Sequence, residues 1–417
     1  MKDTELYAQI LGIGTPFTVA RVALAVAKGA VDIWVEHQEG ARFTCPECDA
    51  SCSLYDHAEE RTWRHLDTCQ LQTLLHARVP RVKCAQHGVR QARVPWADPK
   101  SRFTLLFERF AIDVMLETDG TGAAKILGLS WDEVQHLKQR AVARGRARKP
   151  HVVPARIGMD EKAIAKGQTY LTLTCDLERG TVEHLADGRT LESAASYFST
   201  FNESELSKIE AVAMDMWQPY FKIVSAAVPD AESKIVFDPF HVVAHANKAV
   251  DLVRRRESRE LAARGDRTLV GSKYLWLHGK ENVPRRRRRE FAALKRAKLK
   301  TGRAWAMKEM LRDLWSCKDL ETAERLHRKW HAWAMRSRLE PMIQVAKMVK
   351  SHLPNILTYY THRVTNAVCE GINSAIQTIK KRAFGFRNPE NFKTAIYFHC
   401  GGLDLYPALP ETHAIPG

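Results

Sequence analysis

Apolar and polar residues alternate in two stretches of the first 90 positions, which predicts β-strands there. In VDIWVEH the apolar residues Val31, Ile33 and Val35 occupy every second position, and LQTLLHARVPRVKC, residues 71–84, has a similar strand-like texture. A period of two is typical of a strand that buries one face. Residues 1–40 otherwise have a weak mixed pattern, so we expect VDIWVEH to be the one strand of this region and infer little about its function.

A helical pattern replaces these strands between residues 103 and 148. The segment FTLLFERFAIDVMLE predicts one helix, and a short helix is expected over residues 121–127. A turn at Gly128–Ser130 follows, and a longer helix starts at Trp131 with Ser130 as a suitable N-cap. This order predicts a helix-turn-helix.

The longer helix of this pair carries basic residues toward its C-terminal end, among them Lys138, Arg140 and Arg144. If the helix entered a major groove of DNA, these side chains would lie along the phosphate backbone. Many helical hairpins have such a pattern without touching DNA, so a purely structural hairpin is the alternative.

After residue 150 the pattern changes to strands again. The strand-like segments RIGMDEKAIAKG, QTYLTLTCDLERG and TVEHLADGRT are followed by a helix, the buried strand IEAVAMDM, a second helix, the strand SKIVFDPF and a helix starting at His241. This order predicts a ribonuclease-H-like α/β fold, whose mixed sheet collects acidic residues at strand ends. Residues 250 to about 350 are almost wholly helical, and the helical pattern resumes after Pro354.

Basic residues outnumber acidic ones and are concentrated in one region. The formal net charge is +16 and the pI is near 9.5, which favours a polyanionic partner, with nucleic acid ahead of a membrane. Residues 254–303 contain 18 Lys and Arg against 5 Asp and Glu. Within this stretch Arg285, Arg286 and Arg287 are expected to contact DNA phosphates, and a solvated helix face is the alternative.

The chain carries no sign of membrane insertion or secretion. No apolar stretch reaches the roughly 18 residues that a membrane span needs, and the N-terminus lacks the plan of a secretory signal. We therefore expect a cytoplasmic, nucleoid-associated protein without membrane contact. In such a chain the nine cysteines, five of them between residues 45 and 84, favour metal ligation over disulfides.

Two pairs of metal-ligating residues stand about 35 positions apart: Cys45, Cys48, Cys84 and His87. Each pair can present two ligands from one tight turn, so the spacing predicts a tetrahedral zinc ribbon. Because the protein supplies every ligand, the zinc would be structural and would help a small domain to fold. Buried thiols with an incidental histidine are the alternative, and Cys52 or Cys69 could replace a ligand.

Two aspartates occupy places where carboxylates are poorly solvated. Asp160 follows the apolar Met159 on or beside the first strand of the predicted sheet, and Asp215 ends the apolar run AVAM at the tip of another strand. Two carboxylates at the ends of buried strands repel each other and favour a cation between them. A helix N-cap or a surface turn is the alternative for each of them.

Glu370 lies in VTNAVCEGINSAIQTIKK, which predicts a helix with one polar and one apolar face. The polar face is formed, at spacings of 4, 3 and 4, by Asn366, Glu370, Asn373 and Gln377. Lys380 and Lys381 continue near it and are expected to contact DNA. This face could line a substrate groove, and a plain solvent face is the alternative. Oxygen ligands from two strands and a helix describe a magnesium site that keeps places for water and phosphate oxygens.

Together these motifs make the chain resemble insertion-sequence transposases of the ISL3 family, which are DDE-type enzymes with a ribonuclease-H-like catalytic domain. The matching segments are the knuckles CPEC and CAQHG, the helix-turn-helix, GMDE with the later DGRT, AMDMWQPY, FDPFHVV and TNAVCEGINSAIQTIKKRAFGFRN. They span roughly residues 40–400, and the last four carry most of the specificity.

The resemblance implies that Asp160 and Asp215 are the two catalytic aspartates and that Glu370 is the catalytic glutamate, with 54 and 154 residues between them. It further implies that they hold two Mg²⁺ ions, for which Mn²⁺ can substitute, and that the enzyme cleaves DNA and joins its 3′ ends to a target. The residues expected to support these ligands or to contact DNA are Asp238, His241, Asn366 and Asn373. The long second gap implies an insertion domain before the glutamate helix.

The expected domains are an N-terminal segment (1–40), a zinc-ribbon DNA-binding domain (41–100), a helix-turn-helix (101–150), the first part of the catalytic core (151–248), a basic helical insertion (249–352) and the second part of the core with the glutamate helix and tail (353–417). The expected partner is double-stranded DNA, at the element ends and at the target, bound by a homodimer or higher oligomer. The rival interpretations are a zinc-containing DNA-binding regulator and a ribonuclease-H-like nuclease without transposition.

Overall fold

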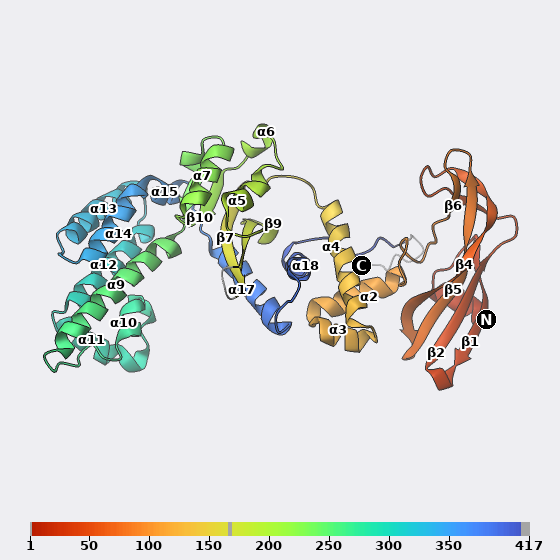
Figure 1. Ribbon diagram of the computed structural model, residues 1–417, viewed down its shortest axis with the longest axis horizontal. Helices are drawn as coiled ribbons and strands as arrows, with labels where there is room; N and C mark the ends of the chain where they lie inside the picture. Colours follow the sequence, from red (N-terminus) through yellow and green to blue (C-terminus); the bar gives the residue numbers. More distant parts are fainter. Residues whose placement is uncertain (1, 166–168, 410–417) are drawn as a thin grey trace. The chain divides into compact units, whose positions relative to one another are not determined.

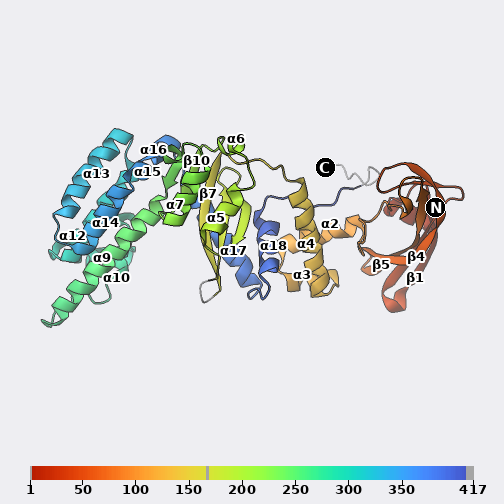
Figure 2. The same ribbon diagram turned by 45° about the horizontal axis from the view of Figure 1, so that its top comes forward.

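The computed structural model describes residues 2–165 and 169–409 and divides into two compact units (Figures 1 and 2). One unit contains the residues up to Lys149, together with Ile379–His399 and the segment from Leu403 onward. The other contains Pro150–Thr378 and Cys400–Gly402. Two helices, α17 (Ala367–Arg382) and α18 (Pro389–Cys400), contribute residues to both units.

The first unit begins with a β-sheet of strand order β1-β2-β5-β4-β3, with β6 paired to β5. Its described elements are α1 (Asp3–Ile10), β1 (Phe17–Ala25), η1 (Val26–Lys28), β2 (Ala30–His37), β3 (Arg42–Thr44), β4 (Ser51–Thr68), β5 (Leu71–Cys84) and β6 (Gly88–Gln91). The strand predicted around Val31, Ile33 and Val35 is confirmed as β2, and these three side chains are buried. Because β2 pairs in parallel with β5, residues before the expected boundary at 41 belong to the same sheet as the second knuckle.

The predicted helix-turn-helix is confirmed as α2 (Leu105–Glu117), α3 (Gly120–Leu127) and α4 (Trp131–Arg148). Gly128 ends α3 in the left-handed conformation (φ 63°), which glycine adopts without a steric penalty. The Ser130 hydroxyl then accepts the backbone N–H of Glu133, and the Glu133 side chain accepts the N–H of Ser130. This capping box starts α4 where the sequence predicts it.

The C-terminal segment packs against these helices, whereas the sequence assigns it to the catalytic core. Arg144 donates to the carbonyl of Leu405 (2.7 Å) and Arg148 to that of Tyr406 (2.6 Å). A Cβ on Gly145 would lie 2.7 Å from the Cβ of Leu403, so glycine lets the segment pass close to α4. Arg144 and Arg148 thus satisfy backbone carbonyls within residues 403–409, which form neither helix nor strand.

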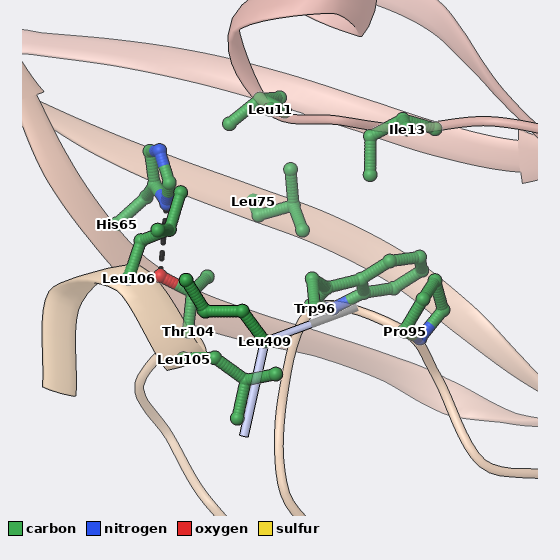
Figure 3. A pocket seen from close by; sticks show the side chains of 10 residues that line it. All are labelled: Leu11, Ile13, His65, Leu75, Pro95, Trp96, Thr104, Leu105, Leu106 and Leu409. Atoms are coloured by element: carbon green, nitrogen blue, oxygen red, sulfur yellow. Dashed lines mark hydrogen bonds between the residues drawn. The ribbon is translucent and has the colours of Figure 1, made fainter. Parts of the chain in front are cut away.

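Leu409 of this segment enters an apolar pocket between the sheet and α2 (Figure 3). The pocket is lined by Leu11, Ile13, His65, Leu75, Pro95, Trp96, Thr104, Leu105, Leu106 and Leu409. Its polar members pair with each other, since His65 Nδ1 and Thr104 Oγ1 are 2.8 Å apart. The pocket is therefore part of the core of this unit.

The second unit is built on a mixed sheet of strand order β11-β10-β7-β8-β9. Its strands are β7 (Arg156–Ala165), β8 (Thr169–Asp176), β9 (Thr181–Asp187), β10 (Ala211–Met214) and β11 (Ile235–Phe237), and its first helices are α5 (Leu191–Phe198), α6 (Glu203–Leu206), α7 (Gln218–Ala227) and α8 (Ala231–Lys234). β7, β8 and β9 form an antiparallel meander, while β10 and β11 run parallel to β7. This topology confirms the predicted ribonuclease-H-like class.

A helical insertion follows β11, as the sequence predicts. It comprises α9 (Pro239–Ala262), α10 (Lys273–Leu277), η2 (Lys280–Asn282), η3 (Arg285–Arg287), α11 (Arg288–Arg296), α12 (Lys300–Arg312), η4 (Asp313–Ser316), α13 (Leu320–Met335) and α14 (Glu340–Ser351), and α15 (Leu353–Leu357) and α16 (Tyr359–His362) lead back to α17. Phe291 makes edge-on contacts with Trp276 (5.0 Å) and Trp305 (5.1 Å), and Trp330 is 1% exposed. These tryptophans therefore form the core of the insertion.

Candidate catalytic site and metal-binding cluster

Four side chains of the first unit meet beside the N-terminal sheet: Cys45, Cys48, Cys84 and His87. One potential ligand atom from each lies within 4.8 Å of all the others. The sulfur atoms of Cys48 and Cys84 are 3.7 Å apart, close to the separation of about 3.8 Å expected for two thiolates on one tetrahedral zinc. His87 Nδ1 lies 3.6 Å from the Cys84 sulfur and 3.7 Å from that of Cys45. The two predicted ligand pairs therefore converge.

The surroundings of this cluster lower the pKa of Cys45 and Cys84, which favours the thiolate form that a metal needs, and raise that of Cys48. Backbone N–H groups of His87 and Gln86 lower the pKa of Cys84 to about 7. Cys52 is buried and donates to the carbonyl of Ala50 (3.4 Å), and Cys69 is exposed between β4 and β5, so neither belongs to the cluster. Four soft or borderline ligands that meet in this way fit a structural zinc ion.

In the second unit, three aspartates form a row across one edge of the sheet. β10 pairs in parallel with both β7 and β11. In this register Asp215, directly after β10, is level with Asp160 on β7 and with Asp238, directly after β11. Parallel strands that end at one edge bring together side chains that are far apart in the sequence. The sheet alone therefore joins Asp160 and Asp215 across 54 intervening residues.

The helix α17 reaches this row because Gly158 leaves room for it. A Cβ on Gly158 would lie 2.3 Å from the sulfur of Cys369 and 2.8 Å from Oδ1 of Asn366, both at the start of α17. Asn366, which is fully buried, donates its side chain to the carbonyl of Met159 (3.3 Å) and its backbone N–H to Asp238 (2.9 Å). These contacts fix the first turn of α17 against β7 and β11.

Glu370 lies in that first turn and faces the row of aspartates. Its backbone N–H donates to the carbonyl of Asn366 (3.0 Å), and one turn later the Asn373 amide donates to Oδ2 of Asp160 (2.7 Å). Burial, together with the charges of Asp238 and Asp160, raises the pKa of Glu370. The structure thus brings the predicted residues Asp160, Glu370 and Asn373 into one cluster.

The acidic cluster holds excess negative charge in a partly dry environment. Burial raises the pKa of Asp160, and the charge of Asp215 adds to this effect while nearby His241 opposes it. Among the described residues of this cluster, three buried oxygen atoms have no hydrogen-bond partner: Oε2 of Glu161, Oδ1 of Asn366 and Oδ1 of Asn373. Repelling carboxylates and unpartnered oxygens are the hard donors that suit Mg²⁺. Among residues 2–165 and 169–409, however, only the Cys and His cluster has three or more acidic, Cys or His ligand atoms within 4.8 Å of one another.

Glu161 is a member of the cluster that the sequence reasoning did not select. Burial raises its pKa, and the charges of Asp215 and Asp160 contribute. Its side chain lies 3.8 Å from the guanidinium of Arg189, the only cation paired with it among the described residues. Its position beside Asp160 in GMDE is the signal that could have pointed to it.

Asp238 and His241 lie where the insertion leaves the sheet. The buried Asp238 carboxylate accepts the N–H of Phe240 (3.0 Å) with one oxygen and that of Asn366 with the other, so it caps α9 and holds α17. His241 is partly buried in the first turn of α9, and its charge acts on Asp160 and Glu370. Both predicted residues therefore lie at the site, and Asp238 serves as a link between two helices.

Three basic residues of α4, Lys138, Arg140 and Arg144, do not have the free surface positions that the sequence suggests. Arg140 and Arg144 both pair with Glu108 of α2, whose side chain is fully buried. Lys138 is 8% exposed, its Nζ lies 5.2 Å from the centre of the Phe398 ring, and burial lowers its pKa to about 8. Their helical spacing directs them toward α2 and α18, so these side chains stabilise the helical domain and are poorly placed for a DNA backbone.

Other predicted DNA contacts have more accessible positions. Arg285 and Arg286 are exposed, and no carboxylate among the described residues pairs with them. Arg287 forms a two-point ion pair with Glu290 (2.8 and 2.6 Å), which occupies its guanidinium. Lys380 and Lys381 lie in the last turn of α17.

Comparisons with known proteins agree with this arrangement. A family model described as a transposase of the ISL3 group matches residues 157–396, more than half of the chain. A zinc-finger model of insertion-sequence transposases matches residues 41–87, and a model of the ISL3 helix-turn-helix domain matches residues 92–137. In the described part of the chain, no helix combines the length and apolar character of a membrane span.

Two curated relatives extend the likeness along the chain. The transposase of insertion sequence element IS1557 from Mycobacterium tuberculosis is 28% identical over 445 aligned positions, which cover 100% of this chain and 99% of the relative. The transposase of element IS1001 from Bordetella parapertussis is 28% identical over 355 positions, covering 84% and 86% of the two chains. The matched segments include both knuckles, the helix-turn-helix and the acidic cluster. The chain therefore belongs to the ISL3 family of insertion-sequence transposases.

Proposed function

We propose that the chain recognises the ends of an insertion sequence, cleaves the DNA there and joins the freed 3′ ends to target DNA. The reaction would be phosphoryl transfer at Asp160, Asp215 and Glu370. The observation that carries this proposal is the convergence of carboxylates from two neighbouring strands and from α17, with burial raising the pKa of Asp160 and of Glu370. Carboxylates whose charges raise one another's pKa in a partly dry site favour bound cations over a purely structural role.

Asp160, Asp215 and Glu370 would hold two Mg²⁺ ions, for which Mn²⁺ can substitute, and such ions stabilise the attacking and leaving oxygens of an in-line displacement. The protein orients its ligands through backbone and amide donors. The N–H of Glu161 and the Asn373 amide each hold one oxygen of Asp160, at 2.8 and 2.7 Å. The N–H of Trp217 holds one oxygen of Asp215 at 2.8 Å.

The positions of the residues around the triad support one site for both reaction steps. Asp238 and Asn366 keep the turn that carries Glu370 against β7, so the three carboxylates can keep one geometry throughout the reaction. Water would be the nucleophile for cleavage, and the freed 3′-hydroxyl would be the nucleophile for joining. No covalent link between protein and DNA is required.

Recognition of the element ends would fall to the zinc cluster domain and the helix-turn-helix. Exposed cations of the insertion, such as Arg285 and Arg286, and Lys381 at the end of α17 would contribute salt-sensitive phosphate contacts. Because two ends must be cut together, we propose that a homodimer or higher oligomer assembles on DNA.

The proposal is tested with Asp215→Asn in the full chain, which keeps the shape of the side chain and removes its charge. Thermal stability, binding to a duplex carrying one element end, and cleavage and joining in Mg²⁺ are measured. We expect a folded variant that binds the end and neither cleaves nor joins. The exposed Glu203→Gln, on α6 of the same unit, is the matched control and should keep full activity.

The other outcomes separate the rival functions. A stable Asp215→Asn variant that still cuts would remove Asp215 from the ligand set. Cleavage without joining by the wild-type chain would favour a nuclease without transposition. End binding without any cleavage in Mg²⁺ or Mn²⁺ would favour a DNA-binding regulator.

A further inference from the structure

The helix that carries Glu370, α17, ends in a turn that places a phenylalanine where glycine is usual. The N–H of Gly385 donates to the carbonyl of Lys380 (2.9 Å), and the N–H of Phe384 donates to that of Lys381 (3.1 Å). This pair of bonds is the Schellman motif, in which the first residue past the cap adopts a left-handed conformation and is usually glycine. Here that residue is Phe384, with φ of 52°.

Phe384 holds this turn in a conformation that is unfavourable for its side chain, and the side chain itself does not stabilise the fold. A left-handed conformation is unfavourable for a large side chain, because Cβ approaches the following carbonyl. The Phe384 side chain is also 100% exposed, so it buries no apolar surface in return. A glycine at this position would remove the strain and the exposed ring together.

The next aromatic residue in the same loop behaves in the ordinary way. Phe386 packs on Phe392 of α18, with ring centres 4.8 Å apart, and Phe392 is 3% exposed. The loop is therefore anchored by one aromatic ring while the other points into solvent. This difference assigns a role outside the fold to Phe384.

The exposed ring is surrounded by positive charge. Lys381, Arg382 and Arg387 are exposed within three residues of Phe384. The sequence contains no Asp or Glu from Gly371 to Pro389, so no acidic residue of this stretch offsets these cations. An apolar ring flanked by exposed cations matches a nucleic acid, whose bases offer flat faces between negatively charged phosphates.

We propose that the loop from Lys380 to Arg387 binds DNA and that Phe384 stacks on a nucleobase, unstacking it from its neighbour. This inference rests on the proposed function, because it takes the DNA on which Glu370 would act as the ligand. The flanking cations contact phosphates, and the ring holds a distorted step of the duplex. Phe384 is a positioning residue, since it touches the substrate away from the carboxylates.

The test uses the full chain and a duplex carrying one end of the element. Thymines of the bound duplex are probed with permanganate, which oxidises unstacked thymines, and affinity, cleavage and thermal stability are measured in parallel. The variants are Phe384→Gly, Phe384→Leu and Phe384→Trp. The matched control is Leu191→Ala, which removes another exposed apolar side chain, on α5.

We expect the wild-type chain to make one or more thymines hyper-reactive and Phe384→Gly to lose this signal. The affinity of Phe384→Gly should fall roughly ten-fold, the usual effect of removing one base-stacking aromatic, while its melting temperature stays equal or rises. Phe384→Trp should keep both signal and affinity, and Phe384→Leu should lose most of each. The control should match the wild type.

The remaining outcomes overturn the inference. The wild-type chain could bind and cleave the duplex and Phe384→Gly could do so equally, with the same permanganate pattern. In that case the proposed stacking of Phe384 on a nucleobase is wrong, and the proposed transposase function is unaffected. If the wild-type chain neither binds nor cleaves, both fall together. If Phe384→Gly changes only self-association without DNA, the ring contacts a second copy of the chain instead.

Discussion

The zinc cluster and the carboxylate cluster both gather metal ligands from distant parts of the chain, but they differ in how completely the protein closes them. Cys45, Cys48, Cys84 and His87 meet within 4.8 Å, a distance at which one ion can touch all four. The carboxylates around Asp160 are more open, and burial raises the pKa of two of the expected ligands. The first arrangement fits a metal that holds a fold together. The second leaves places for ligands that come with the substrate.

The difference also appears in what surrounds each cluster. Backbone N–H groups stabilise the charged form of Cys84, so this site favours that ligand as a thiolate before metal arrives. At the acidic site the Glu161 and Asn373 donors orient Asp160, yet mutual repulsion and burial still disfavour its charge. At the structural site, the surrounding groups thus already stabilise a charged ligand without metal. A catalytic site retains unfavourable electrostatics that a bound cation and substrate can relieve.

Removing a zinc ligand should have the largest effect. Cys84→Ser should abolish zinc binding and unfold the N-terminal domain, because structural zinc contributes on the order of 10 kcal/mol to the folding of small metal-dependent domains. Zinc content by metal analysis and limited proteolysis measure the two losses. Cys52→Ser, a buried cysteine outside the cluster, should keep about one zinc per chain. Zinc-free wild-type protein with a folded N-terminal domain would contradict this prediction.

Gly158→Ala tests how closely α17 must approach β7. A new Cβ 2.3 Å from the Cys369 sulfur must displace the helix, and overpacking of this kind destabilises by about 3 kcal/mol. The cleavage rate should fall by more than the loss of folded protein explains, because Glu370 moves with the helix. The matched control is Gly371→Ala on the same helix, where a Cβ meets no atom within 4 Å. It should be neutral or slightly stabilising, and equal activity of both variants would refute the packing argument.

Asp238→Asn separates a positioning carboxylate from a metal ligand. Both oxygens of Asp238 accept buried N–H groups. In Asp238→Asn one of these oxygens becomes an NH₂ group, which cannot accept, so one backbone N–H loses its partner. This should lower the free energy of unfolding by about 2 kcal/mol. Asp215→Asn should show no such loss. Thermal denaturation and cleavage of the two variants therefore give opposite patterns. If Asp238→Asn is fully stable yet inactive, Asp238 is a ligand.

The sequence predicted the positions of strand residues better than it predicted which basic side chains are free at the surface. Alternation and strand-end placement located Val31, Ile33 and Val35 as well as the row containing Asp160 and Asp215, because these features depend on local periodicity. The fate of Arg140 and Arg144 depends instead on Glu108, 32 and 36 residues earlier in the chain, and helical spacing alone does not reveal such a partner.

The same limit applies to the C-terminal segment and to Phe384. The segment that packs along α4 has no periodic pattern, so its position follows from tertiary contacts such as the approach of Leu403 to Gly145. From the sequence, Phe384 is indistinguishable from any other apolar residue at the end of an amphipathic helix. Its exposure and its left-handed backbone appear only in three dimensions.

The smallest expected effect is a pH dependence of stability that has opposite signs at the two clusters. Burial raises the pKa of Asp160, Glu161 and Glu370 in the folded chain, so the folded state binds protons more tightly than the unfolded state. Their contribution to the free energy of unfolding is therefore present near the ordinary carboxylate pKa, at about pH 4, and is lost as pH rises through the raised values. At the zinc cluster, acid protonates the thiolates and releases the metal, so stability there falls as pH falls, in the opposite direction.

The two contributions can be separated by comparing wild type with Asp160→Asn, since both variants carry the same zinc cluster. In metal-free buffer between about pH 5 and pH 8, the difference in melting temperature should favour Asp160→Asn at high pH and shrink as pH falls, because the wild type has one more buried carboxylate to protonate and so regains more stability. Millimolar Mg²⁺ should abolish this trend in the wild type by neutralising the carboxylates, and it should leave the variant nearly unchanged. Parallel pH profiles that Mg²⁺ does not alter would mean that the acidic cluster is a set of solvated side chains, and the contrast with the zinc cluster would then rest on geometry alone.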